Sequence, residues 1–133
     1  MIKWRIGIVG LLVLGGIATA MAQEAEQAKL LARRAAIADA YRKLAETVYG
    51  LQINSRTYVK DFVTENDEIA TAIDTMVRGI RVGETRFFED GSAEVEAEVT
   101  VAKVIETLRE AHTRHYQGDR VKTEDFVQLS QRT

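Results

Sequence analysis

The 133-residue sequence predicts a small α+β domain in which helices cover one face of a mostly antiparallel sheet, in the order α-β-α-β-β-α. Three observations predict this fold: an amphipathic helical pattern over residues 28–51, an alternating strand pattern after Asp90-Gly91, and the absence of proline and of any Ser/Gly-rich linker. A sheet with one apolar face must bury that face against another layer, so we expect the long helix to cover it.

The longest predicted element is a helix from Ala28 to Leu51. Apolar residues recur there at intervals of three and four, which places them on one helical face, namely Leu30, Ile37, Tyr41, Leu44 and Val48. The alanine content of this stretch gives it a high intrinsic helix propensity. Gly50 followed by apolar Leu51 is typical of a left-handed C-terminal cap, so we expect the helix to end at Tyr49 or Gly50.

Residues 1–22 have the features of an export signal. Two basic residues precede an uninterrupted run of aliphatic residues and glycine from Ile6 to Ile17, and small residues follow. This run of 12 residues is shorter than the roughly 20 that a membrane-spanning helix needs. We therefore expect cleavage after Ala22, with a mature start at Gln23; cleavage after Ala20 is the alternative, and a retained anchor is less favoured.

The stretch after the first helix predicts a strand and then a second helix. β-Branched and aromatic residues are abundant from Gln52 to Val63, which favours a strand, although apolar and polar residues are mixed on both of its faces. An amphipathic helical pattern follows from Glu68 to Arg78, with Gly79 as its stop. Either Thr64 or Asn66 is expected to cap the start of this helix.

The clearest local signal is Asp90-Gly91, which favours a two-residue hairpin turn because glycine tolerates positive φ. Apolar and polar residues then alternate, which predicts a half-buried strand whose inward set is Ala93, Val95, Ala97, Val99 and Val101. Before the turn, a regular strand would direct charged side chains inward together with Phe88. A β-bulge near Gly83–Thr85 would bring Phe87 inward instead, and the sequence leaves this choice open.

A third helix is predicted from Lys103 to about Tyr116, because apolar residues again recur at helical spacing. Gln117-Gly118-Asp119 would end it. We therefore expect a single domain over residues 23–117 and a C-terminal tail over residues 118–133. The tail has too few apolar residues for a core of its own, so we expect it to fray or to dock on a partner.

Composition argues against several classes of function. The chain has no cysteine, which excludes disulfides, thiolate metal sites, a cysteine nucleophile and a lipid anchor on cysteine. The formal net charge of −2 becomes more negative when the signal is removed, which gives no support to nucleic-acid binding. Ser55, Thr57 and Ser92 lie in no nucleophile motif. We therefore expect no enzymatic activity and no cofactor.

His112 and His115 are the only histidines, and they lie three residues apart on the third predicted helix. This spacing lets two imidazoles share a metal ion, but there is no third histidine and no H-E-x-x-H pattern. Solvated surface histidines are therefore favoured over a metal site. Arg33-Arg34 would suit a phosphate, but a basic pair that completes a polar helical face is the commoner arrangement.

Glu94, Glu96 and Glu98 form a row of carboxylates about 7 Å apart on the outer face of the predicted strand. We call these three residues the acidic row. Like charges in a row repel unless something answers them. Screening of this repulsion by water and salt is the favoured interpretation. Arg56 and Lys60 are candidate ion-pair partners within the chain. An interface between identical subunits is the second interpretation.

The polar side of the first helix carries basic residues that would suit the acidic row. For one isolated domain, Arg34 and Arg42 are expected to lie in solvent. In a ring of identical copies they would instead meet the acidic row of a neighbour, in a head-to-tail contact that closes by rotation. A homo-oligomer that uses both sets of residues is therefore a hypothesis, and the solvated faces are the favoured interpretation for a single domain.

Three stretches, taken in order, resemble a known family: AAIADAYRKLAETVYGLQI, TYVKDFVTENDEIATAIDTMVRGIRV and FFEDGSAEVEAEVTV. Together they resemble the small exported outer-membrane lipoproteins that include the flagellar protein FlgP, and they are similar to the N-terminal domain of the flagellar protein FlgT. The resemblance covers residues 28–108. It implies a periplasmic or outer-membrane location, no catalytic activity, and assembly of many copies into rings or disks around the flagellar motor.

One departure from that family matters. FlgP-type proteins generally carry a lipobox cysteine, whereas this predicted signal ends in Ala20-Met21-Ala22. Any association with the outer membrane would then come through protein partners or an uncleaved signal. We expect a periplasmic, non-enzymatic, self-associating component of the flagellar basal body. The alternative is a periplasmic binding module that takes a small ligand or peptide at the sheet edge.

Overall fold

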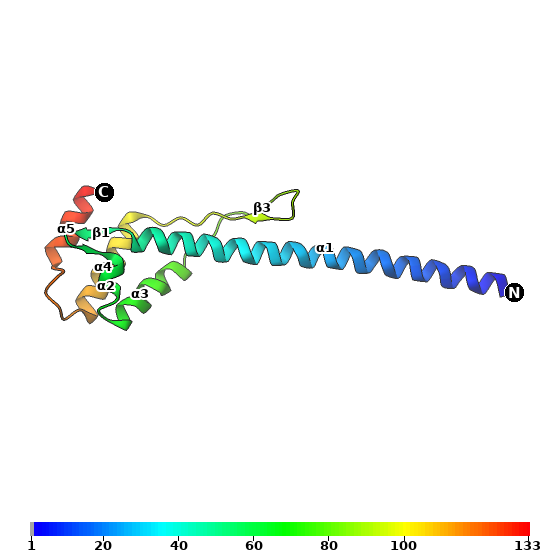
Figure 1. The fold of residues 1–133 in the computed structure, drawn as a ribbon, viewed down its shortest axis with the longest axis horizontal. Helices are drawn as coiled ribbons and strands as arrows, with labels where there is room; N and C mark the ends of the chain where they lie inside the picture. Colours follow the sequence, from blue (N-terminus) through cyan, green and yellow to red (C-terminus); the bar gives the residue numbers. More distant parts are fainter. Residues whose placement is uncertain (1) are drawn as a thin grey trace.

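The computed structural model describes the backbone of residues 2–133 and the side chains of residues 19–133. One very long helix carries a group of shorter helices at its C-terminal end and a hairpin along its side (Figure 1). The helices are α1 (Ile2–Tyr49), α2 (Val59–Val63), α3 (Asp67–Arg78), α4 (Val101–His115) and α5 (Thr123–Arg132). The strands are β1 (Gln52–Asn54), β2 (Thr57–Tyr58), β3 (Arg86–Phe87) and β4 (Ala93–Glu94).

The α+β class is confirmed, but the strands form two separate antiparallel pairs, β1 with β2 and β3 with β4. The second pair runs alongside the long helix, whereas the first pair lies among the helices at the C-terminal end of α1 (Figure 1). The expected single sheet is thus divided into two hairpins.

Helix α1 extends far beyond the predicted start at Ala28, because Ile2–Tyr49 is one continuous helix. The predicted signal is therefore helical in this chain, and the side chains of its apolar run lie outside the described residues. The predicted end is confirmed, with the Gly50 N–H donating to Glu46 at 3.0 Å. The left-handed cap was wrong, since Gly91 is the only described glycine with positive φ. Glycine suits position 50 because a Cβ there would lie 3.2 Å from the Glu46 carbonyl oxygen.

The main hydrophobic core lies where the C-terminal part of α1 meets the four shorter helices. Its largest fully buried side chains include Phe62, Phe126, Ile53, Ile69, Ile73 and Leu108. Each shorter helix contributes to this core, so the core joins residues from both halves of the chain. We call this part of the molecule, Val48 to Ile80 together with Val101 to Thr133, the head.

The strand predicted for Gln52–Val63 is only partly correct. β1 and β2 form a short hairpin, in which the Arg56 N–H donates to the Asn54 side chain at 2.9 Å. The chain then turns into α2, where Val59 and Phe62 are both fully buried. Residues three apart share a face of a helix but lie on opposite faces of a strand, which explains the mixed pattern of the sequence.

Helix α3 begins and ends close to its predicted bounds. Asn66 is the cap, and its side chain accepts a hydrogen bond from the Glu68 N–H at 2.7 Å. The Asn66 side chain also donates to the His115 carbonyl at 3.1 Å, which ties α3 to the end of α4. Thr64 instead bonds back to Asp61 and closes α2.

The hairpin of β3 and β4 contains a β-bulge, which is one of the two alternatives that the sequence left open. Val82 faces Ala97 and Arg86 faces Glu94, so four steps along one strand match three along the other. One extra residue therefore lies within the predicted interval Gly83–Thr85, as a bulge requires.

The turn of this hairpin is longer than predicted. The Phe88 N–H donates to the Ser92 carbonyl at 2.9 Å, which encloses three residues rather than two. Gly91 has a φ of 87° and its N–H donates to the Phe88 carbonyl. This is a turn followed by a left-handed glycine, the usual arrangement of three-residue hairpin loops.

The expected C-terminal tail is instead part of the domain. Residues 123–132 form α5, with Phe126 and Leu129 buried in the main core. Arg132 donates to the Ile53 carbonyl at 3.0 Å, and Asn54 donates to the Arg120 carbonyl at 2.9 Å. The segment therefore docks on its own chain rather than fraying.

Candidate self-association surface

The middle of α1 and the β3–β4 hairpin lie side by side and project away from the head (Figure 1). We call α1 before Tyr41 together with residues 81–100 the arm. Its contact is built from small side chains, since Ala36, Ala40 and Val95 are buried against one another. The alternating pattern of residues 93–99 is confirmed, because its apolar members face α1 and its glutamates face outward. Val101 is the exception: it begins α4 and is 41% exposed.

Much of the arm is uncovered. Every described residue of α1 from Thr19 to Leu31 is exposed, including Leu30 at 45% and Leu31 at 63%. At the hairpin, Phe87 and Phe88 are 49% and 46% exposed, so neither aromatic is buried. Apolar side chains that are uncovered together, on a helix with no layer above it, are typical of an interaction surface.

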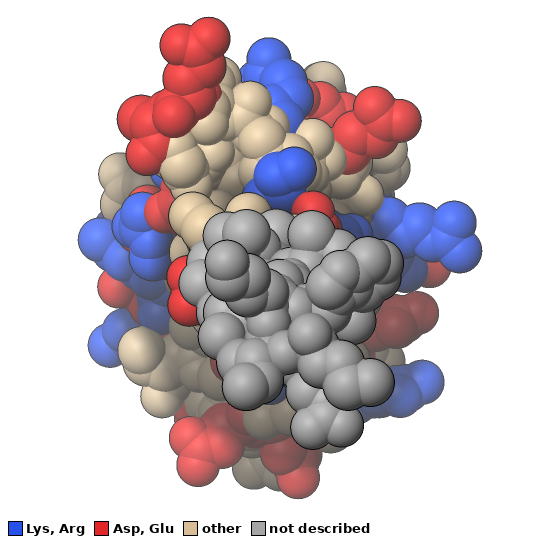
Figure 2. Space-filling view, turned by 90° about the vertical axis from the view of Figure 1, so that its right-hand side faces the viewer, with Lys and Arg blue, Asp and Glu red and all other residues tan. Residues whose placement is uncertain are grey.

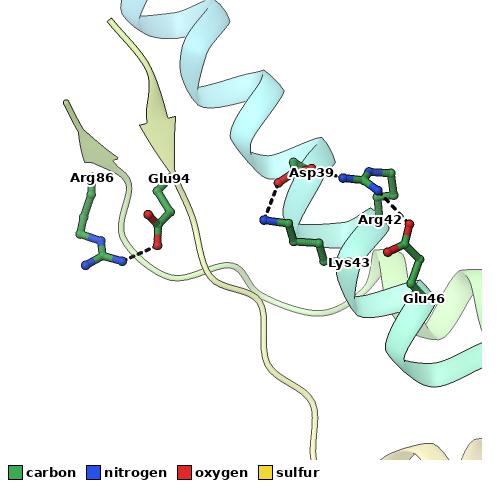
Figure 3. A network of polar contacts seen from close by, with 6 residues as sticks. All are labelled: Asp39, Arg42, Lys43, Glu46, Arg86 and Glu94. Atoms are coloured by element: carbon green, nitrogen blue, oxygen red, sulfur yellow. Dashed lines mark hydrogen bonds and ion pairs between the residues drawn. The ribbon is translucent and has the colours of Figure 1, made fainter. Parts of the chain in front are cut away.

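The acidic row forms ion pairs with an arginine of the hairpin, and not with Arg56 or Lys60 of the first predicted strand. Arg86 donates to Glu94 and lies 3.7 Å from Glu96. The side chains of Arg86 and Glu94 point away from α1 (Figure 3). Glu98 makes no ion pair within the described part of the chain. The row therefore keeps an excess of negative charge on the outer face of the arm.

The candidate cations on α1 differ from each other. Arg42 pairs with Asp39 at 2.6 Å and with Glu46 at 2.8 Å, and Lys43 pairs with Asp39 at 3.0 Å (Figure 3). Hydrogen bonds from Arg42 and Lys43 hold the pKa of the Asp39 carboxyl below its usual value. Arg34, in contrast, is exposed and has no ion pair in the part of the chain that is described.

The five predicted site residues are thus not brought together within one chain. Arg34 and Arg42 lie on α1, whereas Glu94, Glu96 and Glu98 are exposed on the hairpin. A view from the N-terminal end of α1 shows basic and acidic side chains interspersed around the molecule (Figure 2). Their pairing between copies stays a prediction.

An open groove of about 850 Å³ separates one side of α1 from the hairpin. Asp39, Lys43 and Thr47 line it from α1, and residues 92–99 line it from the opposite side. This is the groove that a ligand or an additional strand would enter.

The two histidines have structural partners rather than the solvated positions that we expected. His112 stacks on Tyr116 at a ring-centroid distance of 4.9 Å, and its Nε2 lies 2.8 Å from the Val121 carbonyl oxygen. His115 contacts Glu68 of α3. No group of three or more metal-ligating side chains is found among the described residues.

The hydroxyl candidates also have structural roles. Thr57 is buried at 4% exposure, and the Ser92 hydroxyl donates to Asp90 at 2.6 Å in the hairpin turn. The hydrogen bonds from Ser92 lower the pKa of the Asp90 carboxyl. Neither hydroxyl is hydrogen-bonded to a histidine in the described structure.

Sequence reasoning missed the role of Arg86. A signal for it was available, because the Asp90-Gly91 turn places the residues before it opposite those after it. With the three-residue loop, Arg86 falls directly across from Glu94. Opposite charges at such cross-strand positions are favourable.

In the described part of the chain, no helix combines the length and the apolar composition needed to cross a membrane. Searches among curated proteins and among solved structures gave no significant match. A family model described as LPP20 lipoprotein matches residues 17–100, which is more than half of the chain. That match includes the arm from residue 17 onward and half of the head, and it indicates an exported protein of the cell envelope. The chain belongs to the LPP20 lipoprotein family.

Proposed function

We propose that this envelope protein is a non-enzymatic assembly component that associates with copies of itself in the periplasm or at the outer membrane. The observation that carries this proposal is the uncovered arm. A single helix whose apolar side chains have no partner is marginal in water, because most helical stability in proteins comes from tertiary packing. Contact with further copies would supply the missing packing layer.

The composition supports a proposal for how the protein associates with the membrane. The 133 residues contain no cysteine to carry a lipid, although the family is named for lipoproteins. We infer that the protein reaches the outer membrane through protein partners, and that after cleavage its arm begins near Gln23.

The contact between copies is proposed to include the acidic row. Arg34 is exposed without an ion pair, and Glu98 likewise has none in the described chain. A ring of copies would let such charges pair between neighbours. Arg42 would contribute less than Arg34, since it is already held by two acidic side chains of α1.

A flagellar role is the finer part of the proposal and rests on the resemblance to FlgP and FlgT. Deletion of the gene should abolish or reduce swimming, and a tagged protein should form foci at flagellar bases. Normal motility together with an even envelope distribution would contradict the flagellar role while leaving self-association untouched.

Self-association is tested by size-exclusion chromatography with light scattering on the exported protein over a range of concentrations. We expect a mass of several subunits that is sustained on dilution. A monomer at every concentration would refute the proposal.

The second candidate is a periplasmic binding module, which the open groove beside α1 favours. This candidate predicts a monomer and a ligand that protects the protein against thermal unfolding. Chemical-shift changes at Lys43 and Val95, on the two walls of the groove, would identify the site.

A further inference from the structure

We propose that copies of this chain associate edge to edge, with β3 of one hairpin adding to the free edge of residues 93–97 of the next. These residues comprise β4 and its extended continuation to the bridge at Ala97, and we call them the 93–97 strand. This inference rests on the proposed self-association and specifies the contact that produces it. The result would be a continuous antiparallel sheet of hairpins with the α1 helices side by side beneath it.

The free edge follows from the hydrogen-bond pattern. The Ser92 and Glu96 carbonyls accept hydrogen bonds from Phe88 and Gly83, so the backbone groups of residues 92, 94 and 96 point toward β3. Backbone groups of successive strand residues point to opposite edges, so those of residues 93, 95 and 97 point into the groove. No hydrogen bond within the described chain reaches these groups. An unpaired edge of this kind is a template for another strand.

The inner edge of the same strand shows which segment fits the outer one. It already pairs with a strand that carries Arg86 over the acidic row and directs Val82 toward α1. A second copy offers the same segment, in which the backbone groups of Phe87 point to the outer edge of β3 and have no partner in the described chain. The acidic row would then lie between two arginine-bearing strands instead of beside one, which improves its charge complementarity.

Pairing of two copies of the 93–97 strand is disfavoured by the same charges. In an antiparallel pair, residues directly opposite lie on one face, so the glutamates of one copy would face those of the other. Repulsion between the glutamates therefore disfavours a two-fold contact at this edge, whereas a strand that carries a basic residue can pair there. The contact is head-to-tail, and such contacts build a ring when the rotation between copies closes and an open filament when it does not.

The dimensions of the arm agree with this arrangement. Neighbouring strands lie about 4.8 Å apart, so a two-stranded hairpin would repeat every ~9.6 Å. Packed helices lie about 8–10 Å apart, so the α1 helices could pack at the spacing of the hairpins. Ala35 and Ala38 are exposed on α1 and are small enough for such an approach. The head widens the molecule at one end only, so copies would splay apart at that end (Figure 1).

Disulfide cross-linking tests this contact, because the chain has no cysteine and each introduced thiol is unique. Ala97→Cys marks the free edge of the 93–97 strand. Val82→Cys, Thr85→Cys and Phe87→Cys mark successive positions of the β3 edge, since the register between copies is to be measured. Gln128→Cys, on the exposed side of α5, is the matched control. Circular dichroism verifies that each variant keeps the helical content of the parent.

The expected result is a disulfide-linked dimer when Ala97→Cys is mixed with one of the β3 variants and oxidised. Little dimer is expected from Ala97→Cys alone or from its mixture with Gln128→Cys. Efficient cross-linking of Ala97→Cys with itself would overturn the proposal in favour of a two-fold contact. An intact oligomer that gives no cross-link in any mixture would overturn the edge contact but not self-association, whereas a monomer by light scattering would refute both.

Discussion

Replacement of Phe126 by alanine should destabilise the whole domain, because α5 completes the main core. The Phe126 side chain is fully buried, and its ring centroid lies 6.2 Å from that of Phe62 and 5.3 Å from that of His112. Truncation of a buried phenylalanine costs about 3–5 kcal/mol. The contacts with two rings place the expected loss in the upper half of that range, since aromatic pairs contribute about 0.5–1.5 kcal/mol beyond burial.

The assay is urea denaturation followed by far-ultraviolet circular dichroism, since the only tryptophan lies in the predicted signal. When the same signal is followed during heating, the melting temperature of the Phe126→Ala variant should lie about 15 °C or more below that of the parent. Val127→Ala is the matched control, because Val127 neighbours Phe126 on α5 but is 44% exposed, so it should cost less than about 1 kcal/mol. Equal effects of the two substitutions would refute the packing of α5 and restore the interpretation of residues 118–133 as a tail.

Three further predictions concern the turn, an alkaline transition and the helix cations. Gly91→Ala should destabilise the hairpin by about 1–2 kcal/mol, measured by hydrogen exchange of the arm, because the φ of 87° is unfavourable for a residue with a Cβ; unchanged exchange would contradict it. Burial and the hydrogen bond to Asp74 raise the pKa of Tyr49 to about 12, so the unfolded chain loses this proton first and stability should fall as the pH rises from 10 toward 12. Tyr49→Phe should flatten that decline in urea titrations, and an unchanged decline would assign it to another group. Arg34→Glu should weaken the oligomer at low salt without changing the melting temperature of the head. Arg42→Glu should also weaken α1, because it places a third acidic side chain beside Asp39 and Glu46. An equal oligomer mass for the Arg34 variant and the parent would remove Arg34 from the contact.

The hairpin was the most predictable part of the fold, because its determinants are local. Alternation indicated which face of residues 93–99 is inward, and the excess of charge on one face made a bulge near Gly83 one of two alternatives, which the structure decides. The cap of α3 was equally local, since Asn66 bonds to a backbone group two residues away. Such patterns survive folding because they involve few residues and short distances in the chain.

The elements that sequence reasoning missed depend on contacts between distant segments. α5 has few apolar residues, and it is held in place because Phe126 packs against Phe62 of α2 and His112 of α4. α2 was mistaken for a strand because burial of both Val59 and Phe62 is decided by helices that come later in the chain. For the candidate site, the sequence located the acidic row but not its partner, because Arg86 pairs with it only once the register of the hairpin is known.

The two hydrophobic clusters of this molecule have different strengths. The cluster of the head includes large aliphatic and aromatic side chains, whereas that of the arm is built on Ala36, Ala40 and Val95. The arm should therefore open locally at a lower free energy than the head, and its amides should exchange first. Because association would bind only the closed arm, the protection of these amides should increase with protein concentration while that of the head stays constant. The amide protection of the arm would then report how many copies of the protein are bound to it.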